Sequence, residues 1–240
     1  MEIVLTIAGS DPSGGAGIQQ DLKTITACGC YGATVITSIT SQNTLGVQSA
    51  MAVPADVVAS QLQSVLSDLQ PAAIKIGMIP DSDVAAAIVH ALCDVRVPIV
   101  YDPVMISTSG YALMAPDAID YIAQHLFPLC TLITPNLPEA DRIDVHSLSA
   151  AYLIKGGHAD SNMMTDILYM PDGTTYEYTT PKIRSRNLHG TGCTLSSAIA
   201  SYLALGHTLP QAVALAKDYI TNAILRSVDI HIGSGNGPLV

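Results

Sequence analysis

Charge is scarce in this sequence. Only 12% of the 240 residues are charged, lysine and arginine together number ten, and the formal net charge is −10 at pH 7. Proteins that bind nucleic acid or anionic membranes neutralise phosphate groups with clustered lysine and arginine side chains. The low content of basic residues therefore argues against nucleic acid and membrane surfaces as partners.

Long apolar segments are also missing. The sequence has no run of about 18 apolar residues, which a transmembrane helix would need. The N-terminus has no basic segment, and its apolar run 3–8 is too short for the core of a signal peptide. We therefore expect a soluble, cytoplasmic protein.

Paired cysteines and the common nucleotide-binding glycine motifs are missing as well. The five cysteines include no C-x-x-C pair and no zinc-type spacing, so we expect free thiols in a reducing compartment. Cys28, Cys93 and Cys130 are expected to be small buried apolar residues. The glycines of GSDPSGGAG (9–17) fit neither the Walker A pattern nor G-x-G-x-x-G.

What the sequence does have is enough apolar material for a large core. Hydrophobic residues make up 49% of the chain, and its mass is 25.0 kDa. It has no internal repeat, no low-complexity tract and no recognisable linker. We therefore expect residues 1–240 to form one α/β domain.

Short apolar segments alternate with longer segments of helical period. We expect strands at 2–8, 32–40, 47–53, 72–77, 98–102, 131–135 and 152–156, and a hairpin formed by 166–170 and 174–179. We expect helices at 17–28, 54–69, 82–92, 116–125, 191–205 and 210–226. This order predicts right-handed βαβ units and a mainly parallel sheet covered on both faces.

Unusual residues follow these strands, at the sheet end where α/β proteins bind ligands. Asp11 lies just past a buried strand, where a carboxylate is costly unless it is solvated or has a function. Nearby Gly14, Gly15 and Gly17 fit a turn before a helix as well as a ligand site. Lys155 lies within an apolar strand, from which it would reach the ligand end and could hold a phosphate.

Two carboxylates are expected to converge if their strands are neighbours. Asp102 ends one strand, and Glu139 follows the next in the segment Asn136-Leu137-Pro138-Glu139. Two carboxylates with few cations nearby suit Mg²⁺ held partly through water. The alternative is that Glu139 only begins a helix and favours the positive end of its dipole.

The stretch HGTGCTLSSAIA (189–200) is expected to begin an apolar helix. Gly190, Thr191 and Gly192 would expose unpaired N–H groups that can cradle a phosphoryl group. Cys193 would lie in the same turn, where its thiol pKa could be lowered. Close packing of small residues against the sheet is the alternative for this turn. Taken with Asp102, Glu139 and Lys155, the pattern favours phosphoryl transfer.

Several long motifs in one order resemble a known family. The chain is similar to the hydroxymethylpyrimidine and hydroxymethylpyrimidine-phosphate kinases of thiamine biosynthesis, within the ribokinase-like superfamily. The motifs span nearly the whole chain: TIAGSDPSGGAGIQ, ITSQNTLGVQ, KIGM, DPVM, LITPNLPEA, IKGGH, NLHGTGCTLSSAIA and GSGNGP. The resemblance implies a three-layer αβα sandwich with a mainly parallel central sheet and a small β flap. It also implies a homodimer that uses ATP and Mg²⁺ to phosphorylate 4-amino-5-hydroxymethyl-2-methylpyrimidine and then its monophosphate.

The resemblance also implies roles for individual residues. The pyrimidine pocket would comprise Gly9, Asp11, Gln42, Met78 and Val104. Mg²⁺ would be placed by Asp102 and Glu139, and the nucleotide by Asn136, Lys155, Thr191 and Gly192. Catalysis would involve Lys155, the anion hole of Gly190 and Gly192, and Cys193 in the position of the general base.

Two alternative functions are compatible with the sequence. A pyridoxal kinase of the same superfamily would share Cys193, and a non-catalytic pyrimidine-binding protein would keep the pocket without the transfer chemistry.

Between Glu139 and Lys155 the chain is shorter than in related sequences, close to the minimum of roughly 10–12 residues for a parallel crossover. Either the crossover is trimmed, or a segment is missing and the numbering runs through the gap; we favour the second explanation.

Overall fold

The computed structural model describes residues 1–107, 109–145, 148–156 and 162–240. Its strands are β1 (Ile3–Ser10), β2 (Tyr31–Asn43), β3 (Gly46–Ala52), β4 (Ala73–Ile76), β5 (Ile99–Tyr101), β6 (Leu132–Ile133), β7 (Ala151–Ile154), β8 (Met163–Tyr169) and β9 (Thr175–Pro181). Its helices are α1 (Gly17–Ala27), α2 (Ala55–Asp68), α3 (Ser82–Leu92), α4 (Pro116–His125), α5 (Leu137–Ala140), α6 (Thr191–Ala204) and α7 (Leu209–Ser227), with a 3₁₀ turn at Phe127–Leu129. Each predicted strand and helix has a counterpart, and α5 is additional.

The described strands form one sheet with the order β3-β2-β1-β4-β5-β6-β7-β8-β9. The six strands from β2 to β7 in this order are parallel, whereas β3, β8 and β9 pair antiparallel at the edges. The carboxyl ends of the parallel strands therefore meet at one edge of the sheet. The predicted α/β fold with a mainly parallel sheet is confirmed.

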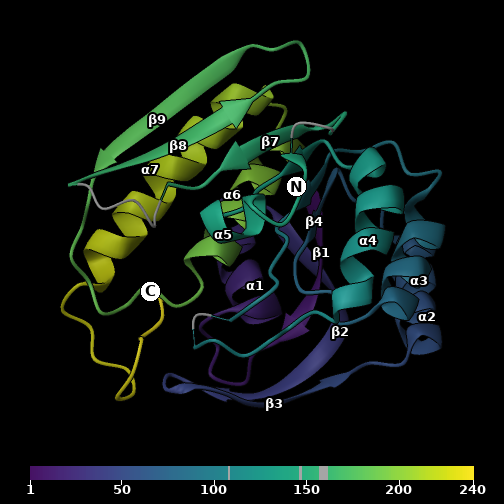
Figure 1. Ribbon diagram of the computed structural model, residues 1–240, viewed down its shortest axis with the longest axis horizontal. Coiled ribbons are helices and arrows are strands. Elements are labelled where there is room, and N and C mark those ends of the chain that lie inside the picture. Colours follow the sequence, from purple (N-terminus) through teal and green to yellow (C-terminus); the bar gives the residue numbers. More distant parts are fainter. Residues whose placement is uncertain (108, 146–147, 157–161) are drawn as a thin grey trace.

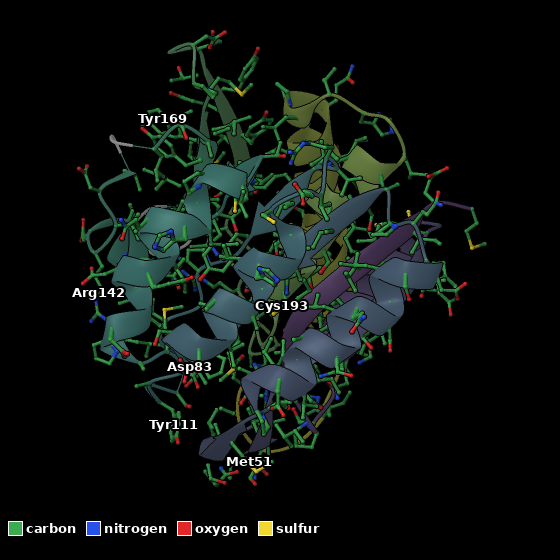
Figure 2. All side chains as sticks on the ribbon, turned by 90° about the vertical axis from the view of Figure 1, so that its right-hand side faces the viewer. Met51, Asp83, Tyr111, Arg142, Tyr169 and Cys193 are labelled. Carbon is green, nitrogen blue, oxygen red and sulfur yellow. The ribbon has the colours of Figure 1, made fainter. Side chains whose placement is uncertain are left out.

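Helices cover both faces of the sheet because the parallel strands are apolar on both sides. Leu5 and Ile74 pack in a core with α2, α3 and α4, whereas their neighbours Val4 and Ala73 pack in a second core with α1, α6 and α7. This alternation follows from the two-residue period of a strand. Figure 1 shows α2–α4 grouped on one side of the sheet, and Figure 2 looks onto that layer.

The crossover from β6 to β7 is short, as the sequence indicated. It contains the four-residue α5, after which Ile143 and Val145 are buried in the core. The N–H groups of Arg142 and Ile143 donate to the carbonyl of Glu139 and continue the turn. The described residues of this segment therefore pack against the sheet without a longer helix.

The cysteines differ in burial more than predicted. All five are free thiols, Cys130 is buried and Cys28 is half-buried, but Cys93 is exposed. The prediction that Cys93 is buried is wrong because α3 ends at Leu92, so Cys93 lies beyond the apolar face of the helix. Among the described helices, none is both long enough and apolar enough to cross a membrane.

Candidate active site

A cavity of about 720 Å³ opens at the carboxyl ends of the parallel strands. The sequence-predicted site residues come from elements far apart in the chain, and every one of them lines this cavity: Gly9, Asp11, Gln42, Met78, Asp102, Val104, Asn136, Glu139, Lys155, Gly190, Thr191, Gly192 and Cys193. Figure 2 places Cys193 near the middle of the molecule. The loop KGGHAD is described only as far as Gly156, and its remaining residues lie outside the described part of the chain.

Asp102 and Lys155 form an ion pair at the base of this cavity. Because β5 pairs with β6 and β6 pairs with β7, the residues that follow these strands lie side by side. Nζ of Lys155 lies 2.7 Å from Oδ1 of Asp102, which also accepts a hydrogen bond from Oγ1 of Thr134 at 3.2 Å. Burial lowers the pKa of Lys155, but the charges of Asp102 and Glu139 outweigh it and raise that pKa above its usual value.

Glu139 both begins a helix and reaches the cavity. Its Oε2 accepts the N–H of Asn136 at 2.8 Å, and its own N–H donates to Oδ1 of Asn136 at 2.9 Å. Burial raises the pKa of Glu139, Lys155 opposes this and Asp102 adds to it. The two explanations given for Glu139 are therefore compatible, since the capping box fixes a carboxyl group that lines the cavity.

The carboxylates fit a magnesium ion that keeps several water ligands. In the part of the chain that the structure describes, no three His, Cys, Asp or Glu side chains gather into a complete metal site. Mg²⁺ commonly takes one or two carboxylates together with water and substrate phosphates, so Asp102 and Glu139 suffice. A Cβ at Gly192 would lie 3.0 Å from Oδ2 of Asp102, so this glycine keeps the carboxylate accessible.

The turn that begins α6 contains both close packing and an open cradle. Gly190 has φ +82°, and a Cβ there would lie 1.9 Å from the carbonyl oxygen of Gly15, so only glycine permits this approach. No side chain caps the helix, and Gly192 faces the Asp102 carboxylate and the ammonium group of Lys155. Gly190 thus secures the turn, and Gly192 lies at the cavity. The prediction of an unpaired N–H is wrong for Thr191, whose N–H donates to the carbonyl of Leu188 at 3.3 Å within the tight turn before the helix.

The prediction of a lowered pKa for Cys193 is wrong for this structure. Burial, with smaller contributions from the nearby carboxylates of Asp21 and Asp102, raises the pKa of its thiol to about 11. Lys75 and a hydrogen bond from the N–H of Gly17 lower it, but not enough to compensate. The helix-start environment was expected to dominate, yet burial of the thiol is the larger effect.

Lys75 is a cavity residue that the sequence analysis did not single out. It is fully buried on β4, and its Nζ lies 2.8 and 2.9 Å from the two carboxylate oxygens of Asp21 on α1. Thr6 and Ser197 donate further hydrogen bonds to Asp21. The available signal was a lysine in the apolar segment AAIKIG, and the side chain places a second positive charge near Cys193.

Gly9, Gln42, Met78 and Val104 lie at the end of the cavity expected to hold the pyrimidine. A Cβ at Gly9 would lie 2.9 Å from Sδ of Met78, so the absence of a side chain lets the methionine pack there. Gln42, near the end of β2, lies 3.1 Å from Nε2 of His189, a residue that the sequence analysis did not place in the site.

Asp11 makes internal contacts where a direct substrate contact was predicted. Its carboxylate accepts hydrogen bonds from the N–H and Oγ of Ser13, from the N–H of Ala16 and from Nε2 of His189. Burial raises the pKa of Asp11, but the hydrogen bonds from His189 and Ser13 outweigh it and lower that pKa. The geometry therefore favours Asp11 as an anchor of the loop over a ligand of the substrate.

A second ion pair lines the cavity beside Gly156. Nζ of Lys217 on α7 lies 2.6 Å from Oδ2 of Asp166 on β8, whose Oδ1 accepts the N–H of Gly156 at 2.9 Å. This pair holds the chain just after Lys155. No spacing in the sequence links these residues, since Asp166 and Lys217 meet only because the hairpin packs against α7.

Comparison with known proteins places this arrangement in a kinase family. The family model described as phosphomethylpyrimidine kinase matches residues 11–240. The hydroxymethylpyrimidine/phosphomethylpyrimidine kinase of Rhizobium meliloti (strain 1021) is 44% identical over 255 aligned residues, which cover 99% of this chain and 96% of that protein. The alignment is longer than the chain, so the relative has residues that this chain lacks.

Solved structures give the same fold for two activities. The phosphomethylpyrimidine kinase of Clostridium difficile 630 is 42% identical, with a TM-score of 0.81 over 93% of this chain and 100% of that one. The ADP complex of Bacillus subtilis pyridoxal kinase is 31% identical, with a TM-score of 0.90 over 100% of this chain and 97% of that one. The backbone is thus common to both activities, and the higher identity lies with the pyrimidine kinases.

Proposed function

Because the chain belongs to the phosphomethylpyrimidine kinase family, we propose that its cavity binds ATP and a hydroxymethylpyrimidine and transfers the terminal phosphoryl group between them. The first product is the monophosphate of 4-amino-5-hydroxymethyl-2-methylpyrimidine, and a second transfer produces the diphosphate for thiamine biosynthesis. The observation that carries this proposal is the common cavity of Asp102, Glu139, Lys155 and the α6 turn. One site thereby offers carboxylates, a cation and the helix start at Gly192, a combination that suits phosphoryl transfer.

The charges of the cavity are proposed to act on the donor phosphate. Lys155 holds Asp102 at 2.7 Å and would move toward the phosphate when nucleotide binds. Gly192 and its neighbours in the first turn of α6 would donate N–H groups to the transferred phosphoryl oxygens, where the helix dipole also favours negative charge. Asp102 and Glu139 would hold Mg²⁺, which supplies positive charge to the donor phosphates when bound.

Cys193 is proposed to contact the hydroxyl group that is phosphorylated. As the hydroxyl oxygen forms its bond to phosphorus and the bond to the ADP oxygen breaks, the hydroxyl proton would pass to Sγ of a Cys193 thiolate. Because burial raises the pKa of this thiol to about 11, the thiol would first release its own proton to water, and only the resulting thiolate could accept the hydroxyl proton. Lys75 lowers that pKa, and its buried charge would favour the thiolate during transfer.

Competition between two substrates tests this function. We expect ATP-dependent turnover of hydroxymethylpyrimidine to exceed turnover of pyridoxal under identical conditions. A clear preference for pyridoxal would reassign the enzyme, in line with its similarity to the Bacillus subtilis pyridoxal kinase fold. Transfer of radiolabelled phosphate from ATP to neither compound would instead support a binding protein without kinase activity.

We also propose that the protein is a homodimer, an expectation that rests on the family likeness. Light scattering coupled to size-exclusion chromatography would give twice the 25.0 kDa chain mass. A mass of one chain across the working concentration range would contradict this proposal.

A further inference from the structure

His189 joins three segments of the chain at the pyrimidine end of the cavity. Its backbone N–H donates to the carbonyl of Gly237 at 3.0 Å, within the C-terminal motif GSGNGP. Its Nε2 lies 2.8 Å from Oδ2 of Asp11 and 3.1 Å from the side-chain amide of Gln42. A Cβ at Gly15 would lie 2.4 Å from the imidazole ring, so the adjoining glycine loop also confines the ring.

The position of the proton on His189 follows from its contact with Asp11. The pKa of Asp11 is lowered by its hydrogen bonds, so its oxygen is a charged acceptor at neutral pH. An oxygen that only accepts needs a donor at 2.8 Å, so Nε2 of His189 carries a proton in the neutral and the charged ring alike.

This proton determines which way the amide of Gln42 is turned. With Nε2 of Gln42 toward His189, two N–H donors would face each other at 3.1 Å. With Oε1 toward His189, the amide oxygen shares the imidazole proton with Asp11. The oxygen and nitrogen of an amide are assigned from their hydrogen-bond partners, and here the partners require the oxygen at this end.

Thr40 supports the same orientation from the other end of the amide. Oγ1 of Thr40 lies 3.2 Å from the amide atom of Gln42 that points away from His189, and it donates its own proton to the carbonyl of Ser10 at 3.0 Å. The hydroxyl therefore has a lone pair available to accept an N–H from Gln42. His189 thus donates to both Asp11 and Gln42, and from Gln42 the donation continues through Thr40 to the carbonyl of Ser10.

We propose that His189 is a positioning residue that determines substrate specificity by holding the Gln42 amide in this single orientation. The inference rests on the proposed function and on a contact between Gln42 and the pyrimidine edge. Held this way, the amide offers the ring one N–H donor and one carbonyl acceptor in a fixed order. A 4-aminopyrimidine presents a ring nitrogen that accepts beside an amino group that donates, whereas a 4-oxopyrimidine presents the reverse order.

The locked amide therefore pairs with one of the two rings and opposes the other. A free amide could rotate by 180° and would match either ring, so loss of the fixed orientation should reduce discrimination between the rings more than activity.

The C-terminal motif GSGNGP holds the segment that carries His189 in place. Asn236 donates its backbone N–H to the carbonyl of Thr44, and its side-chain oxygen accepts the N–H of Leu188. These bonds tie the segment that carries His189 to the turn after Gln42.

The test compares kcat/KM for 4-amino-5-hydroxymethyl-2-methylpyrimidine with kcat/KM for its 4-oxo analogue. We expect His189→Phe, which keeps a ring but has no N–H donor, to reduce the amino-over-oxo preference at least about tenfold. The KM for ATP should stay within about twofold, because the change lies at the pyrimidine end. His189→Gln retains an N–H donor and should recover part of the preference.

His231→Phe is the matched control, because His231 is exposed, lies just before the GSGNGP motif that contacts His189, and does not line the cavity. An unchanged preference in folded His189→Phe would overturn the proposal. If that variant does not fold, Thr40→Val removes the hydrogen-bond partner at the other end of the Gln42 amide. A loss of the amino-over-oxo preference in Thr40→Val would then support the fixed orientation of Gln42, and an unchanged preference would overturn it. Absence of turnover with both pyrimidines in the unmodified enzyme would contradict the proposed function instead of the role of His189.

Discussion

The ammonium group of Lys155 lies 2.7 Å from Oδ1 of Asp102, so the predicted phosphate ligand and the predicted metal ligand neutralise each other in this structure. Asp102 is almost completely buried, and Lys155 is only 17% exposed at the cavity wall. The pair stabilises a buried carboxylate, and under the proposed function an incoming nucleotide would offer Lys155 a second anionic partner.

Replacement of this carboxylate should abolish catalysis without unfolding the protein. We expect Asp102→Asn to lower kcat at least about 100-fold, because the amide carries no charge for Mg²⁺ while it still accepts a hydrogen bond from Lys155. Steady-state turnover over a range of Mg²⁺ concentrations, with circular dichroism to check folding, measures this. Near-normal turnover would remove Asp102 from the metal site.

Loss of the Cys193 thiol should affect the transfer step more than substrate binding. We expect Cys193→Ala to lower kcat far more than it raises the KM for the pyrimidine, since the thiol is proposed to act in the transition state. Cys93→Ala is the matched control, because Cys93 is exposed at the C-terminal end of α3 and does not line the cavity. An unchanged kcat in Cys193→Ala would show that the thiol has no part in phosphoryl transfer, and the anion hole and the metal would then account for catalysis.

The two glycines that flank Thr191 should respond differently to alanine. Gly192→Ala places a methyl group 3.0 Å from Asp102 in a helix with ordinary backbone angles, so we expect activity to fall while stability changes by less than about 1 kcal/mol. Gly190→Ala meets both a positive φ and the carbonyl of Gly15, so we expect a loss of about 1–3 kcal/mol. Urea unfolding beside turnover assays separates the two effects. Equal losses of stability would contradict the distinction.

The buried Lys75–Asp21 pair should show strong coupling. Lys75→Met leaves an unpaired carboxylate in the core and should destabilise the protein by about 3–5 kcal/mol. Asp21→Asn in the same chain removes that charge. Its amide oxygen can accept from one of the hydroxyls of Thr6 and Ser197 and its NH2 group can donate to the other, so the double variant should recover much of the loss. Free energies of unfolding for the single and double variants measure the coupling. Additive losses would show that the pair has no such role.

The contribution of Asp11 to stability should depend on pH. Its folded-state pKa lies below the unfolded value near 3.8, so its stabilisation is present above that value and is lost as pH falls through the folded pKa. We expect Asp11→Asn to cost about 1.5–3 kcal/mol at pH 7 and to equal the unmodified protein at pH below the folded pKa. Unfolding curves at pH 7, 5 and 3 test this. A cost that does not shrink on acidification would contradict a charged anchor.

The sequence alone determined the order and type of the elements, because apolar period and glycine or proline positions are local properties. The spans 82–92 and 116–125 agree with α3 and α4, and the turn before β3 lies between the predicted strands. The strands before Asp102 and Asn136 were predicted longer than β5 and β6, which end at Tyr101 and Ile133, before the loops that line the cavity. The family motifs further indicated a kinase and the residues that line one cavity.

Tertiary structure decided the contacts that no spacing encodes. Lys75 and Asp21, and Lys217 and Asp166, pair only after α1 and the β8–β9 hairpin have packed. The pKa of Cys193 depends on how deeply the thiol is buried. This burial has a larger effect on the pKa than the helix dipole, which was the only effect that the sequence indicated. Likewise His189 faces Asp11 and Gln42 because three distant segments meet beside the cavity. Local sequence sets backbone preference, whereas burial and charge proximity arise only when separate segments share one interior.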